Sequence, residues 1–202
     1  MKKILLAVFV LATASVQAQY VKATFEENSL GWTEISDKKG EAVIKEGVLH
    51  LEAHNARGVH EKWYSQPIRI ESHCFSTLDV SENFEIKVDM TAGRSGRGYI
   101  GLMLDYEDSS NFLAFIFNKR SAFLLRFVNG SSRAIAYSPM NLKYDYGDKV
   151  SVSVKNTYKE VQFYVDNIQA VKVRNYPLSH SGFGLFVWDQ QIVDVNSVEF
   201  IQ

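Results

Sequence analysis

The sequence predicts an all-β protein, built as a two-sheet antiparallel β-sandwich. Three observations carry this prediction. Apolar and polar residues alternate with a period of two in many short segments, turn signals of Gly, Asn and Asp separate these segments, and no apolar stripe of helical period follows the N-terminal region. Alternation indicates a strand with one buried face, and about a dozen such strands with regular turns are typical of a sandwich or barrel.

The first 18 residues predict a signal peptide. A basic start, Lys2-Lys3, precedes an apolar run from Ile4 to Ala12, and Val16-Gln17-Ala18 fits the small-x-small rule for cleavage. The run is shorter than the roughly 20 apolar residues of a membrane span, so we expect no membrane insertion after cleavage. An uncleaved anchor is the disfavoured alternative. We therefore expect one β-sandwich domain over residues 19–202, located in the periplasm or outside the cell.

The strands follow one another along this domain. The clearest alternations are Phe84–Met90, Val150–Lys155 and Val161–Asp166. The other predicted strands are Ala42–Ile44, Val48–Ala53, Tyr99–Tyr106, Phe112–Asn118, Ala122–Val128, Arg133–Tyr137, Gln169–Arg174, Gly182–Val187 and Ser197–Ile201. Asn129-Gly130 and Asp166-Asn167 predict hairpin turns, because these residues tolerate a positive φ. Tyr99–Tyr106 and Phe112–Phe117 are apolar on both faces. We therefore expect these two strands in the middle of a sheet, with part of their second face lining a covered groove.

The charge balance argues against a nucleic-acid-binding protein, and the cysteine content excludes a fold held by an intrachain disulfide. Without the signal peptide, 20 basic residues stand against 23 acidic ones, a net charge of −3. This balance argues against nucleic acid as a partner. The single cysteine, Cys74, forms no intrachain disulfide and is expected to be a small core residue. The oligomeric state is left open.

Several segments carry a resemblance to a known superfamily. They are Thr24–Trp32, Glu46–Leu51, Gly101–Asp108 with Asn111-Phe112, Tyr164–Asn167, and Gly182–Leu185 followed by Val195 and Val198. Their order resembles concanavalin A-like lectin/glucanase jelly rolls, and most closely the laminin-G-like and 3-keto-disaccharide-hydrolase-type domains of exported bacterial proteins. The resemblance implies that the terminal strands pair and that the concave sheet carries the ligand.

No catalytic motif is present in the sequence. The glucanases of this superfamily carry Glu-x-Asp-x-x-Glu on one strand, and Asp105, Glu107 and Asp108 are the nearest approach to it. We expect a solvated strand end followed by a turn acid there, because turns often use Asp. The Gly-x-Ser-x-Gly elbow of serine hydrolases is also absent from the sequence. No residue is therefore assigned a catalytic role.

One pattern has the residue types of a metal site. His50-x-Glu52-x-His54 places three potential ligands on one strand face. Neighbours two apart lie about 7 Å apart at Cα, so a pair can share an ion, but the outer two are about 13 Å apart. Glu26 and Asp194 are a second candidate, for a structural calcium ion between the terminal strands. We expect a solvated polar face at His50 and assign no metal and no cofactor.

Aromatic and planar polar residues are the best indication of a ligand site. Sugars present apolar faces edged with hydroxyls, so a glycan site needs an aromatic platform with polar groups beside it. Alternation places Tyr99 and Asp105 on one face, and Trp188 with Asp189 follows a strand. Trp32 is expected in the core instead. The predicted ligand-binding residues are Trp63, Tyr64, Arg97, Tyr99, Asp105, Arg126, Trp188 and Asp189.

These observations favour an exported, non-catalytic carbohydrate-binding β-sandwich module with a glycan or other extracellular ligand as its partner. Two alternatives remain. The hydrolase-type resemblance implies a glycoside hydrolase-like enzyme acting on a sugar derivative. The fold also suits a structural or protein-interaction domain.

Overall fold

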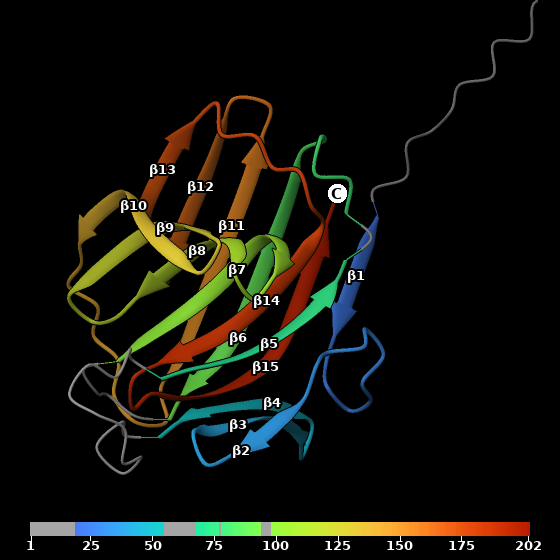
Figure 1. Ribbon diagram of the computed structural model, residues 1–202, viewed down its shortest axis with the longest axis vertical. Helices are drawn as coiled ribbons and strands as arrows, with labels where there is room; N and C mark the ends of the chain where they lie inside the picture. Colours follow the sequence, from blue (N-terminus) through green and yellow to red (C-terminus); the bar gives the residue numbers. More distant parts are fainter. Residues whose placement is uncertain (1–18, 55–67, 77, 94–97) are drawn as a thin grey trace, which may run out of the picture.

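The computed structural model describes residues 19–54, 68–76, 78–93 and 98–202. Figure 1 shows two antiparallel sheets lying face to face, with the strands of one crossing in front of the other. Every element of regular secondary structure in these ranges is a β-strand, which confirms the predicted all-β sandwich. Accordingly, this part of the chain contains no helix long and apolar enough to cross a membrane.

The large sheet contains nine of the strands in the described residues. Its order is β13-β12-β11-β6-β15-β4-β3-β2, and β1 pairs with β15 from the side. Tyr20 lies opposite Ile201, so the terminal strands pair as the resemblance implied. The strands are β1 (Tyr20–Ala23), β2 (Ile35–Asp37), β3 (Gly40–Lys45), β4 (Val48–Ala53), β6 (Phe84–Ala92), β11 (Lys149–Thr157), β12 (Glu160–Val165), β13 (Ile168–Arg174) and β15 (Ile192–Ile201).

The small sheet contains the other six described strands, in the order β10-β9-β8-β7-β14-β5. Strands β7 and β8 lie inside this sheet, as expected for segments that are apolar on both faces. The strands are β5 (Arg69–Phe75), β7 (Tyr99–Asp108), β8 (Asn111–Phe117), β9 (Ser121–Val128), β10 (Ser131–Pro139) and β14 (Gly182–Trp188).

One apolar core fills the space between the sheets. Phe115 of β8 and Phe163 of β12 stack across it, with 4.8 Å between their ring centroids. Trp32 lies in the core against Phe25 and Phe183, as predicted. Cys74 is also a buried core residue, and burial raises the pKa of its thiol to about 12 because the thiolate loses its hydration.

The turn chemistry read from the sequence is confirmed. Asn129 and Gly130 have φ values of 50° and 77° and connect β9 to β10. Asp166 and Asn167 have φ values of 48° and 63° and connect β12 to β13. Two successive positive φ values match the right-handed twist of the flanking strands.

Strand β5 was not predicted, because a polar residue interrupts its alternation. Ile70, Ser72 and Cys74 point inward, and the Ser72 hydroxyl donates to the Thr33 carbonyl oxygen at 2.6 Å. That hydrogen bond lets a polar side chain occupy a core position. The short strands β1 and β2 were also missed. Strand β15 begins earlier than expected, and a register shift after Val195 breaks its pattern.

Candidate ligand-binding face

The outer face of the small sheet carries a second apolar cluster, which the sheet itself separates from the core. On β7, Ile100 and Leu102 point into the core, whereas Tyr99 and Met103 belong to the outer cluster. The buried members are Met103, Tyr106, Phe112, Ala114, Ile116, Leu125, Phe127 and Phe186. One face of an antiparallel sheet is commonly polar and solvated, so a large apolar outer face indicates an interaction surface.

Four partly exposed rings form a continuous row on this face, which we call the aromatic strip: Trp188, Tyr99, Phe123 and Tyr137. They come from β14, β7, β9 and β10, so the row crosses most of the sheet. Successive ring centroids lie 6.5, 6.0 and 4.9 Å apart. Trp188 lies directly opposite Tyr99, and Phe123 directly opposite Tyr137. Tyr137 is 60% exposed at the end of the row.

Buried rings support the strip. Phe112 and Phe127 stack with centroids 4.4 Å apart and an interplanar angle of 9°, and Phe127 contacts Trp188. The ring of Phe186 lies across Gly101, where a Cβ atom would come within 2.2 Å of it. A glycine on β7 thus makes room for a large ring on β14, and the tightly packed layer holds the exposed rings in place.

A polar group borders the same cluster, and we call it the polar edge: Arg69, Glu71, His73 and Tyr106. Arg69 lies over Phe112, 4.8 Å from the guanidinium carbon to the ring centroid, and its Nε lies 2.8 Å from Glu71 Oε2. His73 stacks on Tyr106 with 4.4 Å between centroids. The guanidinium is therefore held by a ring below it and a carboxylate beside it.

Burial shifts the pKa values of the polar edge. It raises the pKa of Glu71, although the Arg69 guanidinium opposes the shift. It lowers the pKa of His73. The pKa of Tyr106 rises to about 12, first because of burial and then because of the Glu71 carboxylate nearby. Each shift favours the neutral form, so this edge presents hydrogen-bonding groups on a partly dehydrated surface.

The structure brings together only some of the predicted ligand-binding residues. Tyr99 and Trp188 are neighbours in the aromatic strip. Asp189 follows Trp188 in a turn with φ of 54°, and its backbone N–H donates to the Ile68 carbonyl oxygen at 3.0 Å. It therefore lies at the rim of the strip. The predicted Trp63, Tyr64 and Arg97 lie outside the described residues.

Asp105 and Arg126 are not part of this face. They form an ion pair with each other, and Asp105 is only 4% exposed. Its Oδ1 atom also accepts hydrogen bonds from the backbone N–H groups of Ser179 and His180, at 2.7 and 2.8 Å. These contacts anchor the segment between β13 and β14. The prediction that both residues share a surface with Tyr99 is therefore wrong.

A β-bulge explains the error at Asp105. Strict alternation places this residue on the outer side of β7, but the register between β7 and β8 shifts near the end of β7, and Asp105 has φ of 50°. The bulge turns Asp105 inward and brings Tyr106 to the outer cluster. Arg126 lies opposite Leu113, a residue of the core between the sheets, so it also faces inward.

The carboxyl group at the end of β7 is a turn acid, as predicted. Asp108 Oδ1 accepts the backbone N–H of Ser110 at 2.7 Å and the side-chain amide of Asn111 at 3.0 Å. These hydrogen bonds lower the pKa of Asp108, the Asn111 contact most strongly. The carboxylate thus closes the β7–β8 turn.

Six residues of the strip and the polar edge were missed in the sequence. Phe123 and Tyr137 extend the strip, and the whole polar edge was missed: Arg69, Glu71, His73 and Tyr106. Alternation within β9 places Phe123 outward with Phe127, so the pattern contained this signal. Arg69 and Glu71 were hidden because β5 itself was not recognised. Together these residues provide ring faces and planar polar groups, the combination that stacks on and hydrogen-bonds to a sugar.

Comparisons with known proteins find similar folds among solved structures but no matching sequence family. No protein-family model matches the chain, and no curated protein matches its sequence. The carbohydrate-binding module CBM66 from Bacillus subtilis is 20% identical over 83% of this chain and 94% of its own, with a TM-score of 0.54.

Two further solved structures are similar in fold. The carbohydrate recognition domain of Emp46p is 11% identical over 88% of this chain and 94% of its own, with a TM-score of 0.61. The Bacillus licheniformis β-glucanase is 10% identical over 90% of this chain and 97% of its own, with a TM-score of 0.61. At these identities the likeness establishes architecture and not activity. The chain therefore has the concanavalin A-like lectin/glucanase jelly-roll fold.

Proposed function

We propose that the chain is an exported, non-catalytic carbohydrate-binding domain that holds a glycan against the aromatic strip. The observation that carries this proposal is the row of four partly exposed rings, from Trp188 to Tyr137, on the outer face of the small sheet. Exposed apolar rows are uncommon on monomeric proteins unless they bind something. The signal-peptide pattern of residues 1–18 supports export.

The chemistry of the face suits a sugar chain better than an apolar ligand. Sugar rings stack their C–H faces on aromatic rings and direct hydroxyls sideways. Arg69 lies opposite Trp188 across β5 and β14, and Asp189 follows Trp188 in the chain, so both bring charged hydrogen-bonding groups close to the end of the strip. Two of the similar structures are described as a carbohydrate-binding module and a carbohydrate recognition domain, which agrees with this proposal.

A glycan array followed by affinity electrophoresis tests the proposal. We expect the chain to bind at least one glycan and Trp188→Ala to weaken that binding roughly 30-fold, because losing a central aromatic contact costs about 2 kcal/mol. Lys87→Ala, on the outer face of the large sheet, is the matched control and should leave binding unchanged. Equal loss in both variants, or full binding by Trp188→Ala, would contradict the proposal.

The raised pKa of Glu71 favours a second candidate, a glycoside hydrolase-like enzyme. A buried carboxyl group whose pKa is raised holds its proton to higher pH than an exposed one, which suits a general acid. Release of reducing sugar from the glycan that binds best, lost in Glu71→Gln, would select this candidate. Binding without product release would select the non-catalytic module. No glycan binding on the array would leave a structural or protein-interaction domain.

A further inference from the structure

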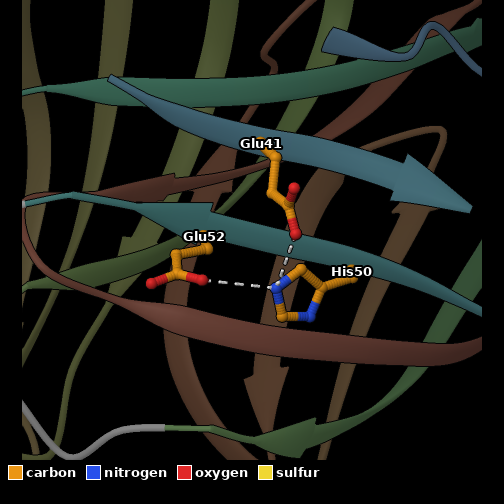
Figure 2. A group of neighbouring side chains, drawn as sticks. All are labelled: Glu41, His50 and Glu52. Carbon is orange, nitrogen blue, oxygen red and sulfur yellow. Dashed lines mark ion pairs between the residues drawn. The ribbon is translucent and has the colours of Figure 1, made fainter. Parts of the chain in front are cut away.

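A second cluster of chemically active side chains lies on the outer face of the large sheet. Figure 2 shows Glu41 on β3 and both His50 and Glu52 on β4, with the two carboxylates directed at the same ring nitrogen. Glu41 lies directly opposite Glu52 across the strand pair. One ligand atom from each residue lies within 4.8 Å of the other two. The sheet therefore brings three potential metal ligands, one imidazole and two carboxylates, close together.

The distances within this cluster match a tetrahedral ion better than direct hydrogen bonds. His50 Nε2 lies 3.5 Å from Glu41 Oε1 and 3.6 Å from Glu52 Oε2. Both exceed the usual hydrogen-bond range of about 2.7–3.2 Å. Ligands bound tetrahedrally to zinc at about 2.0–2.2 Å are separated by roughly 3.3–3.6 Å. Two of the three ligand separations therefore match a tetrahedral zinc site, and the two carboxylates, whose ligand atoms lie within 4.8 Å of each other, would move closer together around the ion.

The other nitrogen of His50 is already held as it is in metal-bound histidines. His50 Nδ1 lies 2.6 Å from Asp194 Oδ1, on the neighbouring strand β15. A carboxylate there keeps the proton on Nδ1 and leaves the lone pair of Nε2 facing the two glutamates. Three lone-pair groups facing one another repel unless a cation lies between them. A divalent ion placed between the three groups would balance them more fully than the Lys45 ammonium group, which is hydrogen-bonded to Glu41.

We propose that Glu41, His50 and Glu52 bind one divalent ion of the zinc class, with water as the fourth ligand. One imidazole and two carboxylates suit zinc, whereas Ca²⁺ needs six to eight oxygen ligands. The Lys45 ammonium group occupies Glu41 Oε1 at 2.7 Å. Exposed ion pairs of this kind contribute little to stability, so the ion displaces the lysine at small cost. The site is independent of the proposed glycan-binding function.

The proposed ligand set differs from the sequence pattern His50-x-Glu52-x-His54. His54 Nε2 lies 3.9 Å from Glu52 Oε1, and its Nδ1 lies 3.2 Å from the Lys38 carbonyl oxygen. His54 is thus directed elsewhere, and Glu41 from the adjacent strand takes the third place. This exchange of one ligand gives the experiment a matched control.

Isothermal titration of the chelator-treated chain with ZnCl₂, without a histidine tag, tests the proposal. We expect one zinc per chain, no measurable binding by His50→Gln or Glu41→Gln, and unchanged binding by His54→Gln. Asp194→Asn should weaken binding about 10–100-fold, because Asp194 positions His50 without touching the ion. Lys45→Gln should bind zinc more tightly, because it removes the competing ammonium group.

Thermal unfolding in excess chelator checks that each variant folds, and Glu52→Gln replaces any ligand variant that does not. No zinc binding by the wild-type chain would overturn the proposal, and the carboxylates would then surround a protonated imidazole. Retained binding by Glu41→Gln together with lost binding by His54→Gln would also overturn it. Tighter binding by Lys45→Gln would support it.

Discussion

The outer faces of the two sheets differ in chemistry, although their inner faces meet in one apolar core. On the large sheet, β6 directs Glu85, Lys87 and Asp89 outward, where they line a shallow groove with residues of β11 and β12. Glu85 lies 3.4 Å from the Lys155 ammonium group. On the small sheet, the outward positions are mainly rings and aliphatic side chains, and several of them are buried.

The two outer faces therefore differ in how much they stabilise the fold. Exposed ion pairs such as Glu85 with Lys155 contribute little to the free energy of unfolding, so the large sheet's outer face adds little to stability. The outer face of the small sheet is packed as a second apolar layer, so it stabilises the fold and also exposes rings at one end. The small sheet's outer face offers rings on which a ligand can stack, whereas the large sheet's outer face offers carboxylates and an imidazole that can bind an ion.

The largest expected effect comes from removing a ring of the outer layer. Phe112 is fully buried there, and Phe112→Ala should lower the free energy of unfolding by about 3–5 kcal/mol. Lys87→Ala on the opposite outer face should cost less than about 1 kcal/mol. Urea denaturation followed by tryptophan fluorescence measures both. Similar losses in the two variants would show that the outer layer is not packed as a core.

A smaller effect should follow from Gly101→Ala. The added Cβ atom would come within 2.2 Å of the buried Phe186 ring, and such overpacking costs about 1–3 kcal/mol. Phe186→Leu removes the ring, so the double variant should cost less than the sum of the two single changes. Urea midpoints of the three variants measure this coupling. Strictly additive costs would mean that the ring and the glycine do not constrain each other.

The smallest expected effect is a pH dependence of opposite sign on the two faces. Burial raises the pKa of Glu71 above its usual 4.5. The stability that protonated Glu71 contributes is therefore fully present below pH 4.5 and is lost as pH rises through the raised pKa of the folded protein. The hydrogen bond from Lys45 lowers the pKa of Glu41. The stability that ionised Glu41 contributes is therefore present above pH 4.5 and is lost as pH falls through the lowered pKa of the folded protein.

Urea midpoints measured from pH 3 to 7 check these two signs. Relative to the wild-type chain, Glu71→Gln should gain stability as pH rises, and Glu41→Gln should lose it. Slopes of the same sign in both variants would remove the distinction between a buried carboxyl on the small sheet and a paired one on the large sheet.

Local patterns were enough to predict most strands and the hairpin turns. Asn129-Gly130 specifies its turn by backbone preference alone, and the alternation of Phe84–Met90 specifies a half-buried strand. Prediction failed where a tertiary contact changes the local rule. Ser72 is buried because Thr33 accepts its hydrogen bond, and Asp105 turns inward because of a bulge.

The sequence by itself determined that the chain forms a β-sandwich, and it singled out Tyr99 and Trp188, which meet in the aromatic strip. That information lies in the period of two and in the turn residues, which act over a few positions. Only the tertiary structure decided which residues share each surface. Phe123 reaches Tyr99 across β8, and Glu41 reaches His50 from the next strand. Cross-strand neighbours depend on register and strand order, which couple residues far apart in the chain, and no local pattern encodes them.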